Sequence, residues 1–421
     1  MNAPPLSPIR GWILCLVATF TMAISYIDRQ TLAVVATSVQ ETLHIGDHEY
    51  GWLVSAFSIA YLLGAPLAGR FVDALGARRG LLIAVLAWSA VAAAHALTPS
   101  FGVLFLFRIL LGAAESPSFP GAAQTVYRAL PERHHSRGIG VLFTGSSIGA
   151  MVAPLLGAAL LHRFGWRGAF LGTALVGLVW VPIWFLTAFS PRAKAALDRN
   201  EAPTPTPAPR ASMLRTLAHP AVYRAAILVV ASSPTIGFLI NWGPKMLERE
   251  GVARADIGHY LWLPPLAFDV GAILFGDLAA RRRAKRDASD HAPDRWLIGI
   301  AAFMATSLVL YPFHRGAYGM LAIASIAMAG GGAIFALLTA DMLARVAPGN
   351  VAAAGGVTAA AQSLAYILCN PLVGLSVEQS HAYNLACVSI GALVAPGALI
   401  WMLLPAPPRH GATADRAATS P

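Results

Sequence analysis

Two acids and two bases lie inside long apolar stretches of this sequence, where charged residues are rare. Asp28 and Arg29 are neighbours near the end of the first stretch, and Arg108 and Glu115 lie within the fourth. Each costs at least a few kcal/mol to place in hydrocarbon, so each needs a partner or a hydrated cavity. Paired structural charges are the general alternative, but ionisable residues within a membrane segment usually mark a functional site.

This set of side chains suits the binding of an anion together with a proton. Arg29 or Arg108 supplies a fixed positive charge for a substrate carboxylate, and a guanidinium binds carboxylates in a bidentate manner. Asp28 and Glu115 are the expected proton-coupling groups, because a buried carboxylate takes up a proton more easily once substrate occupies its arginine partner. The sequence therefore predicts that anion binding and proton uptake are linked.

The spacing along two helices brings these groups to similar depths. At 1.5 Å per residue, Asp28 lies about 25 Å along a helix that begins near Gly11, and Arg108 about 10 Å along one that runs the opposite way. In a hydrocarbon core of about 30 Å, Asp28, Arg29 and Arg108 form one cluster. Glu115 lies seven residues beyond Arg108, on the same helix face and about 10 Å deeper.

The composition indicates the elements that must carry these residues. Of the 421 residues, 57% are hydrophobic and only 12% are charged, about half the charged fraction of a typical soluble chain. We predict an all-α membrane protein with twelve transmembrane helices in two six-helix bundles. The expected helices begin near Trp12, Trp52, Leu81, Phe101, Ile139, Ala169, Ala225, Tyr260, Trp296, Tyr318, Ala352 and Asn384.

The distribution of basic residues predicts the orientation. Most of the 30 basic residues fall in alternate connecting segments, and short basic loops stay in the cytoplasm. Both termini are therefore expected to be cytoplasmic, and the formal charge of +10 is a topology signal and not a nucleic-acid surface. The cysteines lie in apolar stretches, so neither a disulfide framework nor a metal site is expected.

A proline-rich stretch near the middle of the chain predicts the domain boundary. Residues 202–209 alternate proline with alanine or threonine and are followed by Arg210, a pattern typical of a stiff linker. The expected domains are an N-terminal six-helix bundle (1–190), a cytoplasmic linker (191–222), a C-terminal six-helix bundle (223–405) and a cytoplasmic tail (406–421). A weak internal repeat agrees with two parallel halves. Its two copies are Gly69-x-x-x-Asp73-x-x-Gly76-x-Arg78-Arg79 and Gly276-Asp277 followed by Arg281-Arg282-Arg283.

The first of these motifs resembles the cytoplasmic loop signature of the major facilitator superfamily, with Ala74 where a basic residue is usual. Three further motifs resemble the anion:cation symporter branch, and within it the bacterial hexuronate and aldonate transporters. They are Tyr26-Ile-Asp28-Arg29, Arg108-x-x-x-Gly112-x-x-Glu115-x-Pro117-x-Phe119-Pro120 and Gly145-Ser146-Ser147-x-Gly149-Ala150-x-x-Ala153-Pro154. The resemblance covers about the first 190 residues well and the second half less well.

The resemblance implies roles for individual residues. Asp28 and Glu115 match groups that carry protons, and Arg29 matches an arginine that binds substrate. Tyr26 and Tyr61 match aromatic positions that line the cavity, the alternative being tyrosines that only pack. Ser146 is expected at the substrate, although close helix packing explains it nearly as well.

Further residues are expected at the substrate or at a gate. Asn241 and Trp242 in the seventh span are expected to contact substrate. Gln362, Tyr366 and Asn370 form a polar stripe at i, i+4 and i+8 that either binds substrate hydroxyls or bonds to another helix. The expected cytoplasmic gate consists of Asp73, Arg78, Arg79 and Asp277. Asp269 and Asp341 are expected to be gate or packing charges.

The first hypothesis is proton-coupled symport of an organic anion, a sugar acid such as a hexuronate or aldonate, across the bacterial inner membrane by a monomer. A less hydroxylated or aromatic carboxylate is the alternative, favoured by a tenth span nearly bare of polar groups between Gly330 and Thr339. A membrane sensor or integral-membrane enzyme is the alternative from another class. No glycine loop with a lysine for phosphate is present, so no nucleotide cofactor is expected, and the proton is the coupling ion.

Overall fold

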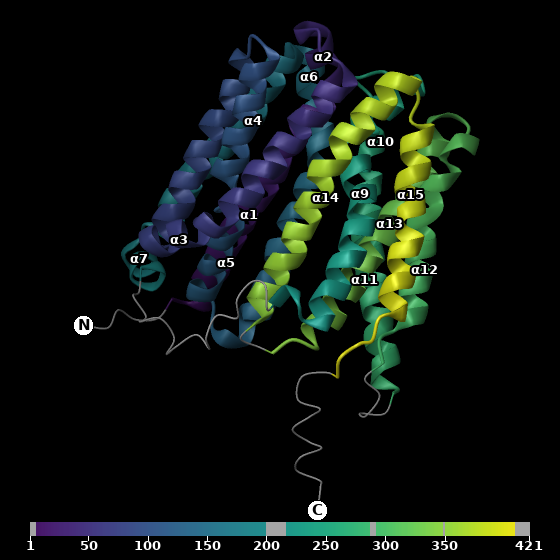
Figure 1. Ribbon diagram of the computed structural model, residues 1–421. Coiled ribbons are helices and arrows are strands. Elements are labelled where there is room, and N and C mark those ends of the chain that lie inside the picture. Colours follow the sequence, from purple (N-terminus) through teal and green to yellow (C-terminus); the bar gives the residue numbers. More distant parts are fainter. Residues whose placement is uncertain (1–5, 199–215, 287–291, 348–349, 409–421) are drawn as a thin grey trace, which may run out of the picture. The chain divides into compact units, whose positions relative to one another are not determined.

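The computed structural model describes residues 6–198, 216–286, 292–347 and 350–408, and the regular elements in these ranges are all helices. Figure 1 shows these helices along the chain. The elements of the first half are α1 (Pro8–Val34), α2 (Ala36–Leu43), α3 (Asp47–Ala94), η1 (His95–Leu97), α4 (Phe101–Glu115), α5 (Ser118–Ala129), η2 (Glu132–His134), α6 (His135–Ala188) and α7 (Pro191–Leu197). Those that follow are α9 (Pro220–Arg249), α10 (Ile257–Leu261), α11 (Leu263–Ala284), α12 (Arg295–Ala305), η3 (Thr306–Phe313), α13 (Gly316–Leu343), α14 (Val351–Ser380) and α15 (Asn384–Leu403).

Ten helical stretches in the described part of the chain are long and apolar enough to cross a membrane. Two of them contain the long helices α3 and α6, of 48 and 54 residues, each of which would measure more than 70 Å if straight. Each is broken by a glycine with positive φ, Gly76 at 75° and Gly165 at 68°, a backbone conformation that favours glycine. The expected count of twelve spans and the cytoplasmic termini stay predictions.

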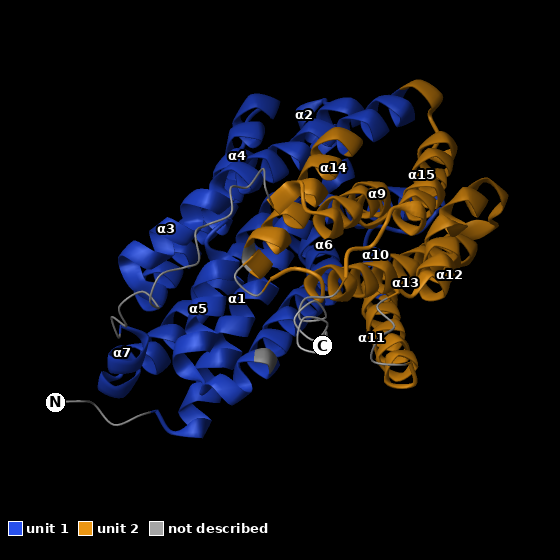
Figure 2. Ribbon diagram, turned by 60° about the horizontal axis from the view of Figure 1, so that its bottom comes forward, with its two compact units in different colours: residues 1–201, 240–262, 370–378 blue, residues 202–239, 263–369, 379–421 orange. Residues whose placement is uncertain are grey.

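The chain divides into two compact units, which Figure 2 colours separately. Unit 1 comprises residues 1–201, 240–262 and 370–378, and unit 2 comprises residues 202–239, 263–369 and 379–421. Helix α9 therefore contributes one end to each unit, and α14 contributes residues 370–378 to unit 1 and its other residues to unit 2. The expected domain boundaries stay predictions, and residues 199–215, which include the proline-rich stretch, lie outside the described residues.

Unit 1 is built around α1, which packs along α5 and α6, while α3 packs along α4. Its core contains three fully buried tryptophans, Trp88 on α3 and Trp180 and Trp184 on α6. The last two stack with centroids 5.0 Å apart. Trp180 Nε1 donates to the Val17 carbonyl at 2.8 Å, so its polar atom is satisfied inside an apolar core.

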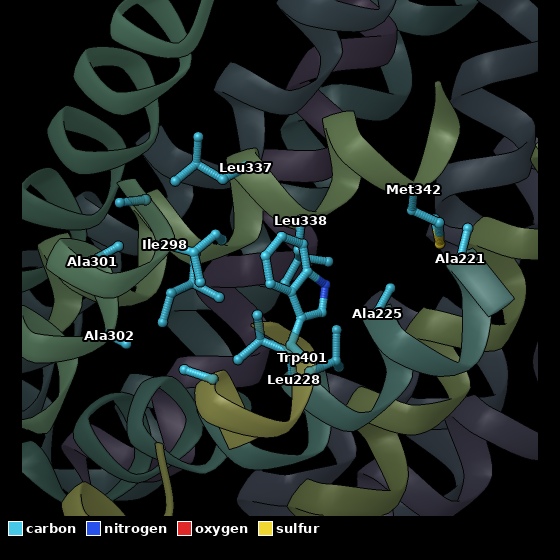
Figure 3. Packing of buried hydrophobic residues seen from close by; sticks show 14 of the residues in the cluster. Ala221, Ala225, Leu228, Ile298, Ala301, Ala302, Leu337, Leu338, Met342 and Trp401 are labelled. Atoms are coloured by element: carbon cyan, nitrogen blue, oxygen red, sulfur yellow. The ribbon is translucent and has the colours of Figure 1, made fainter. Parts of the chain in front are cut away.

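Unit 2 has a separate core, where α9, α12, α13 and α15 meet. Figure 3 shows Trp401 of α15 among aliphatic side chains that include Leu228 of α9, Ile298 of α12 and Leu338 of α13. Between α11 and α13 the backbones approach closely. A Cβ at Gly332 would lie 1.9 Å from the Phe268 carbonyl oxygen, so only glycine fits this crossing. Small residues at helix contacts are a regular feature of membrane bundles.

The outer surface of the helices is strongly apolar. Leu186, Phe303 and Phe313 are 82%, 80% and 79% exposed, and many other large hydrophobic side chains also face outward. A soluble protein rarely exposes so many large apolar side chains. Lipid tails cover such a surface at no cost in free energy, in agreement with a bundle that spans a bilayer.

A short helix within the expected linker was not predicted from the sequence. Helix α7 begins where the Ser190 hydroxyl accepts a hydrogen bond from the Ala193 amide at 3.4 Å, with Pro191 at its first position. Serine at the N-cap and proline next to it are a standard helix start. The linker range 191–222 is therefore helical at its beginning.

Candidate functional site

The charged residues of the first and fourth spans meet inside unit 1. Arg29 of α1 donates from Nε to Glu115 Oε2 of α4 at 2.7 Å, and the Ser25 hydroxyl donates to the same oxygen at 2.7 Å. Glu115 is fully buried, and Arg29 is 21% exposed. A buried carboxylate is tolerated only with a charged partner and further hydrogen bonds, and this one has both.

Three aromatic rings surround the Arg29 guanidinium. Its carbon Cζ lies 5.2 Å from the ring centroid of Tyr26, 4.9 Å from that of Phe57 and 4.7 Å from that of Tyr61. Phe57 and Tyr61 stack one turn apart on α3, with centroids 5.8 Å apart. Cation–π contacts of this kind hold a guanidinium without neutralising it. We call these residues, together with Ser25 and Glu115, the Arg29 cluster.

Both members of the ion pair keep unused hydrogen-bonding capacity. Among the described residues, Glu115 Oε1 and Arg29 Nη2 have no hydrogen-bond partner. Unpaired buried polar atoms cost free energy and are found mainly where water, an ion or a ligand binds. The Arg29 cluster can therefore accept a further polar group, such as a substrate carboxylate on Arg29 or a proton on Glu115.

Arg108 also lies beside Phe57 and is buried. Its Cζ is 5.1 Å from the Phe57 centroid, its Nε donates to the Leu53 carbonyl at 3.3 Å, and only 3% of its surface is exposed. Counting residues along the two helices predicted similar depths for Arg29 and Arg108, and both side chains do contact Phe57. Glu115 was expected deeper, but the long arginine side chain of α1 reaches it.

Asp28 points in a different direction from Arg29. Consecutive residues on a helix are turned by about 100°, so Arg29 faces α4 while Asp28 lies beside Thr173 of α6. Asp28 is 2% exposed, and neither of its carboxylate oxygens has a hydrogen-bond partner among the described residues. Asp28 therefore lies at the contact between α1 and α6, on another face of α1 from Arg29, while it stays near enough to Glu115 for the two charges to interact.

The serine-rich motif of α6 forms that contact with α1. A Cβ at Gly145 would lie 2.3 Å from the Thr19 carbonyl oxygen, and one at Gly149 would lie 2.4 Å from that of Ala23. This close approach places Ser146 beside the Tyr26 hydroxyl. Ser146 thus borders the Arg29 cluster through Tyr26, and its contact with substrate stays a prediction.

Asn241 and Trp242 lie in a second polar region of unit 1, where the end of α9 meets the start of α3. Tyr50 donates its hydroxyl to the Asn241 carbonyl at 2.7 Å and contacts the Trp242 ring edge to face at 4.9 Å. Trp242 is fully buried and donates to Asn370 Oδ1 of α14 at 3.2 Å. These contacts are structural, and the predicted role of both residues in substrate binding is untested.

Several ion pairs surround this second region. Lys245 of α9 pairs with Asp47 at the start of α3, and the Arg254 guanidinium donates to both oxygens of Glu41 at 3.0 and 2.5 Å. These hydrogen bonds from Arg254 lower the pKa of Glu41, and they raise that of Arg254. We call Glu41, Asp47, Lys245 and Arg254 the ion-pair cluster, which the sequence did not predict.

The polar stripe of α14 divides between the two units. Gln362 Nε2 donates to the Tyr366 hydroxyl at 3.2 Å, and both residues lie in unit 2, where Tyr366 packs against Gly237 of α9. Asn370 lies in unit 1, bonded to Trp242. Interhelical hydrogen bonding, one of the two alternatives, therefore describes Asn370. The substrate role of Gln362 and Tyr366 stays a prediction.

The loop motif after the second span is anchored by an acid that the sequence did not single out. Arg78 is 2% exposed, donates from Nε to Asp198 Oδ1 at 3.0 Å and lies over the Phe189 ring at 4.3 Å. Asp73 instead accepts from Gln124 Nε2 at 3.3 Å, and Arg79 is exposed. The motif pattern did not reveal this pairing, because Asp198 lies 120 residues away along the chain.

The corresponding charges of unit 2 are also paired. Asp277 accepts from Arg281, one turn on in α11, at 2.7 Å. Asp341 of α13 accepts from Arg345 Nη2 at 2.6 Å and lies 3.7 Å from buried Arg224. Each of these aspartates has an arginine that balances its charge. Their predicted role in a gate is untested.

Two residues of the Arg29 cluster were missed by sequence reasoning. Ser25 lies one helical turn before Arg29, and Phe57 lies one turn before Tyr61, so the i, i+4 rule alone places each on the predicted functional face. The rule does not identify the helix on which the partner of each residue lies.

No group of three or more metal-ligating side chains occurs among the described residues.

Long apolar helices with a buried ion pair define a multi-pass membrane protein. The chain belongs to the Major Facilitator Superfamily, whose profile matches residues 18–288. It is similar to the galacturonate transporter of Dickeya chrysanthemi, with 28% identity over 276 residues, 63% of this chain and 80% of the relative. The hexuronate transporter of Escherichia coli K12 is also 28% identical over 278 residues, 63% of this chain and 64% of its own length.

A third relative matches over nearly the whole chain. The D-galactonate transporter of Escherichia coli O6:H1 is 28% identical over 421 residues, 94% of this chain and 96% of its own length. Among solved structures, a bacterial homologue of the human lysosomal transporter Spinster, in an inward-facing and unoccupied conformation, shares the fold. It has a TM-score of 0.77 at 19% identity and covers 95% of this chain and 97% of that one. These matches confirm the resemblance that the sequence motifs indicated.

Proposed function

We propose that this chain is a secondary active transporter that carries an organic anion, a sugar acid of the hexuronate or aldonate type, together with protons. The observation that supports this proposal is the Arg29–Glu115 ion pair at 2.7 Å, which is buried inside a transmembrane bundle. Each of the two residues also has one polar atom without a hydrogen-bond partner among the described residues. The names of the relatives support a sugar acid. We propose that the protein acts as a monomer in the bacterial inner membrane. The proton is the proposed coupling ion, and no other cofactor is proposed.

The proposed mechanism is a competition for one guanidinium. Substrate carboxylate and Glu115 both bind Arg29, and the three aromatic rings hold the guanidinium in place while its partner changes. When substrate takes Arg29, Glu115 loses its counter-charge in a site shielded from water, where an unpaired carboxylate is costly. Proton uptake by Glu115 removes that cost, so anion and proton bind together. Asp28, equally buried, is the proposed second proton-coupling group.

The three rings around Arg29 favour a second candidate. Tyr26, Phe57 and Tyr61 place three aromatic rings at the guanidinium, and stacking on aromatic rings suits an aromatic carboxylate. In this case the substrate carboxylate still competes with Glu115 for Arg29, and only the part of the substrate that carries the carboxylate differs. The alternative of a sensor or enzyme has no support from the relatives, which are named transporters.

The test is uptake into proteoliposomes with an imposed pH gradient. Radiolabelled D-glucuronate and D-galactonate are compared with benzoate, each with the interior alkaline and with no gradient. Gradient-driven accumulation of a sugar acid, lost in Arg29→Gln, is the expected result. Accumulation of benzoate alone selects the second candidate. Uptake that ignores the pH gradient, or that persists in Arg29→Gln, contradicts the mechanism. Arg163→Gln is the control, because Arg163 is exposed near the middle of α6.

A further inference from the structure

An open cleft lies at the end of unit 1 where α1 begins and α6 ends. It has a volume of about 210 Å³ and includes Arg10 and Ile13 of α1, Leu186 and Thr187 of α6, and the N-cap Ser190 of α7. None of these residues belongs to the Arg29 cluster or to the loop motif with Arg78. The cleft is therefore a separate feature of the bundle surface.

The wall of the cleft is apolar and turned outward. Ile13 is 42% exposed and Leu186 is 82% exposed, and both are near the ends of helices that are long and apolar enough to span a membrane. Ile9, one helical position before Arg10, is 74% exposed. Side chains of this kind at the end of a membrane helix face the acyl chains of the adjacent leaflet.

The rim of the cleft is positively charged. Arg10 is exposed and forms no ion pair or hydrogen bond with any described residue. Two further exposed cations, Arg192 and Lys194, lie on α7 beside Ser190. Asp198, the residue after α7, is bonded to buried Arg78. Within the described part of the chain, no acid is paired with the cations of the rim.

An apolar wall below a cationic rim matches one kind of partner in a bilayer. We propose that this cleft binds an anionic phospholipid, with its phosphate on Arg10 and the α7 cations and the first part of an acyl chain against Ile13 and Leu186. Basic residues next to a membrane helix attract anionic headgroups. The bound lipid links the start of α1 to α7, the helix that also anchors Arg78 through Asp198.

The test is native mass spectrometry of the detergent-purified full chain titrated with phosphatidylglycerol or phosphatidylcholine. The wild type is expected to bind one phosphatidylglycerol more tightly than phosphatidylcholine. Arg10→Gln weakens phosphatidylglycerol binding about fivefold, the effect of one basic residue at an anionic surface, and leaves phosphatidylcholine unchanged. Arg163→Gln, which removes an exposed cation near the middle of α6, binds both lipids as the wild type does.

A second variant separates the lipid from a free anion. Ile13→Trp fills the apolar wall at an exposed position and is expected to weaken both lipids, while inorganic phosphate at millimolar concentration displaces neither. Equal binding of phosphatidylglycerol by the wild type and Arg10→Gln overturns the proposal. So does displacement by inorganic phosphate, which identifies a simple anion site instead of a lipid site.

Discussion

Replacing Glu115 by glutamine tests the competition at Arg29 most directly. The substitution keeps the shape of the side chain but removes its negative charge and its proton, so the ionic contact with Arg29 is lost. If substrate must displace Glu115 from Arg29, the wild type loses binding free energy in breaking that contact. Glu115→Gln avoids this loss, so it is expected to bind substrate more tightly while failing to accumulate it.

The magnitude follows from the geometry. The contact is one hydrogen bond of 2.7 Å between two charged groups, and such bonds contribute about 1.5–3 kcal/mol. Its removal corresponds to about 10- to 100-fold tighter substrate binding at alkaline pH. At acidic pH the wild-type Glu115 is protonated and releases Arg29 by itself, so the two proteins converge. Wild-type affinity therefore falls as pH rises, and the variant shows no such dependence.

The assay is calorimetric titration of purified protein with the sugar acid that gives accumulation, at pH values from 5 to 9. Counterflow in proteoliposomes at equal pH checks that the variant still exchanges substrate. The control is Glu132→Gln, an exposed acid in η2 outside the cluster, which is expected to behave as wild type. Weaker binding by Glu115→Gln at alkaline pH, or an unchanged pH dependence, refutes the competition.

Three further substitutions test the supporting structure. Glu41→Gln is expected to lower the melting temperature slightly at neutral pH, and the loss of stability is less than about 1 kcal/mol because the pair is exposed. Because the pKa of Glu41 is lowered in the fold, the difference from wild type shrinks below the ordinary pKa of glutamate and disappears once the pH falls through the lowered pKa. Gly145→Leu places a side chain on the α1 backbone and is expected to cost 3 kcal/mol or more by roughly the upper range of overpacking, whereas Gly140→Leu, with open space around it, melts as wild type. Asp198→Asn leaves the buried Arg78 charge without its partner, so thermal melting is expected to show a loss of about 3 kcal/mol; an unchanged melting temperature contradicts the anchoring of the loop by α7.

Much of the local structure could be predicted from the sequence. Apolar stretches of about 20 residues must become helices in a bilayer, since no other segment satisfies its own backbone there. The positions of Arg29 and Glu115 within those helices, and the tyrosines near them, follow from counting residues at 1.5 Å each. Helix α7 was not predicted, because a helix of seven residues is too short to show a recognisable periodic pattern of apolar residues.

Which charges pair was not predictable by the same means. Asp28 and Arg29 are adjacent in sequence, yet only Arg29 reaches α4, because one residue along a helix changes the direction of a side chain by about 100°. Arg78 was grouped with Asp73 in one motif, yet it bonds Asp198 beyond the end of α6. In both cases the partner lies on another helix, and helix rotation is set by packing.

The sequence by itself determined a helical membrane protein, its family and the set of intramembrane charges, because hydrophobicity and spacing act locally along the chain. Only the tertiary structure decided that Glu115 is the partner of Arg29, that Phe57 lies between Arg29 and Arg108, and that Asp28 faces α6. The physical reason is the close packing of the helices. Gly112 brings α4 against the Phe57 carbonyl, and Gly145 and Gly149 bring α6 against α1, and these crossings fix the rotation of every charged side chain between them.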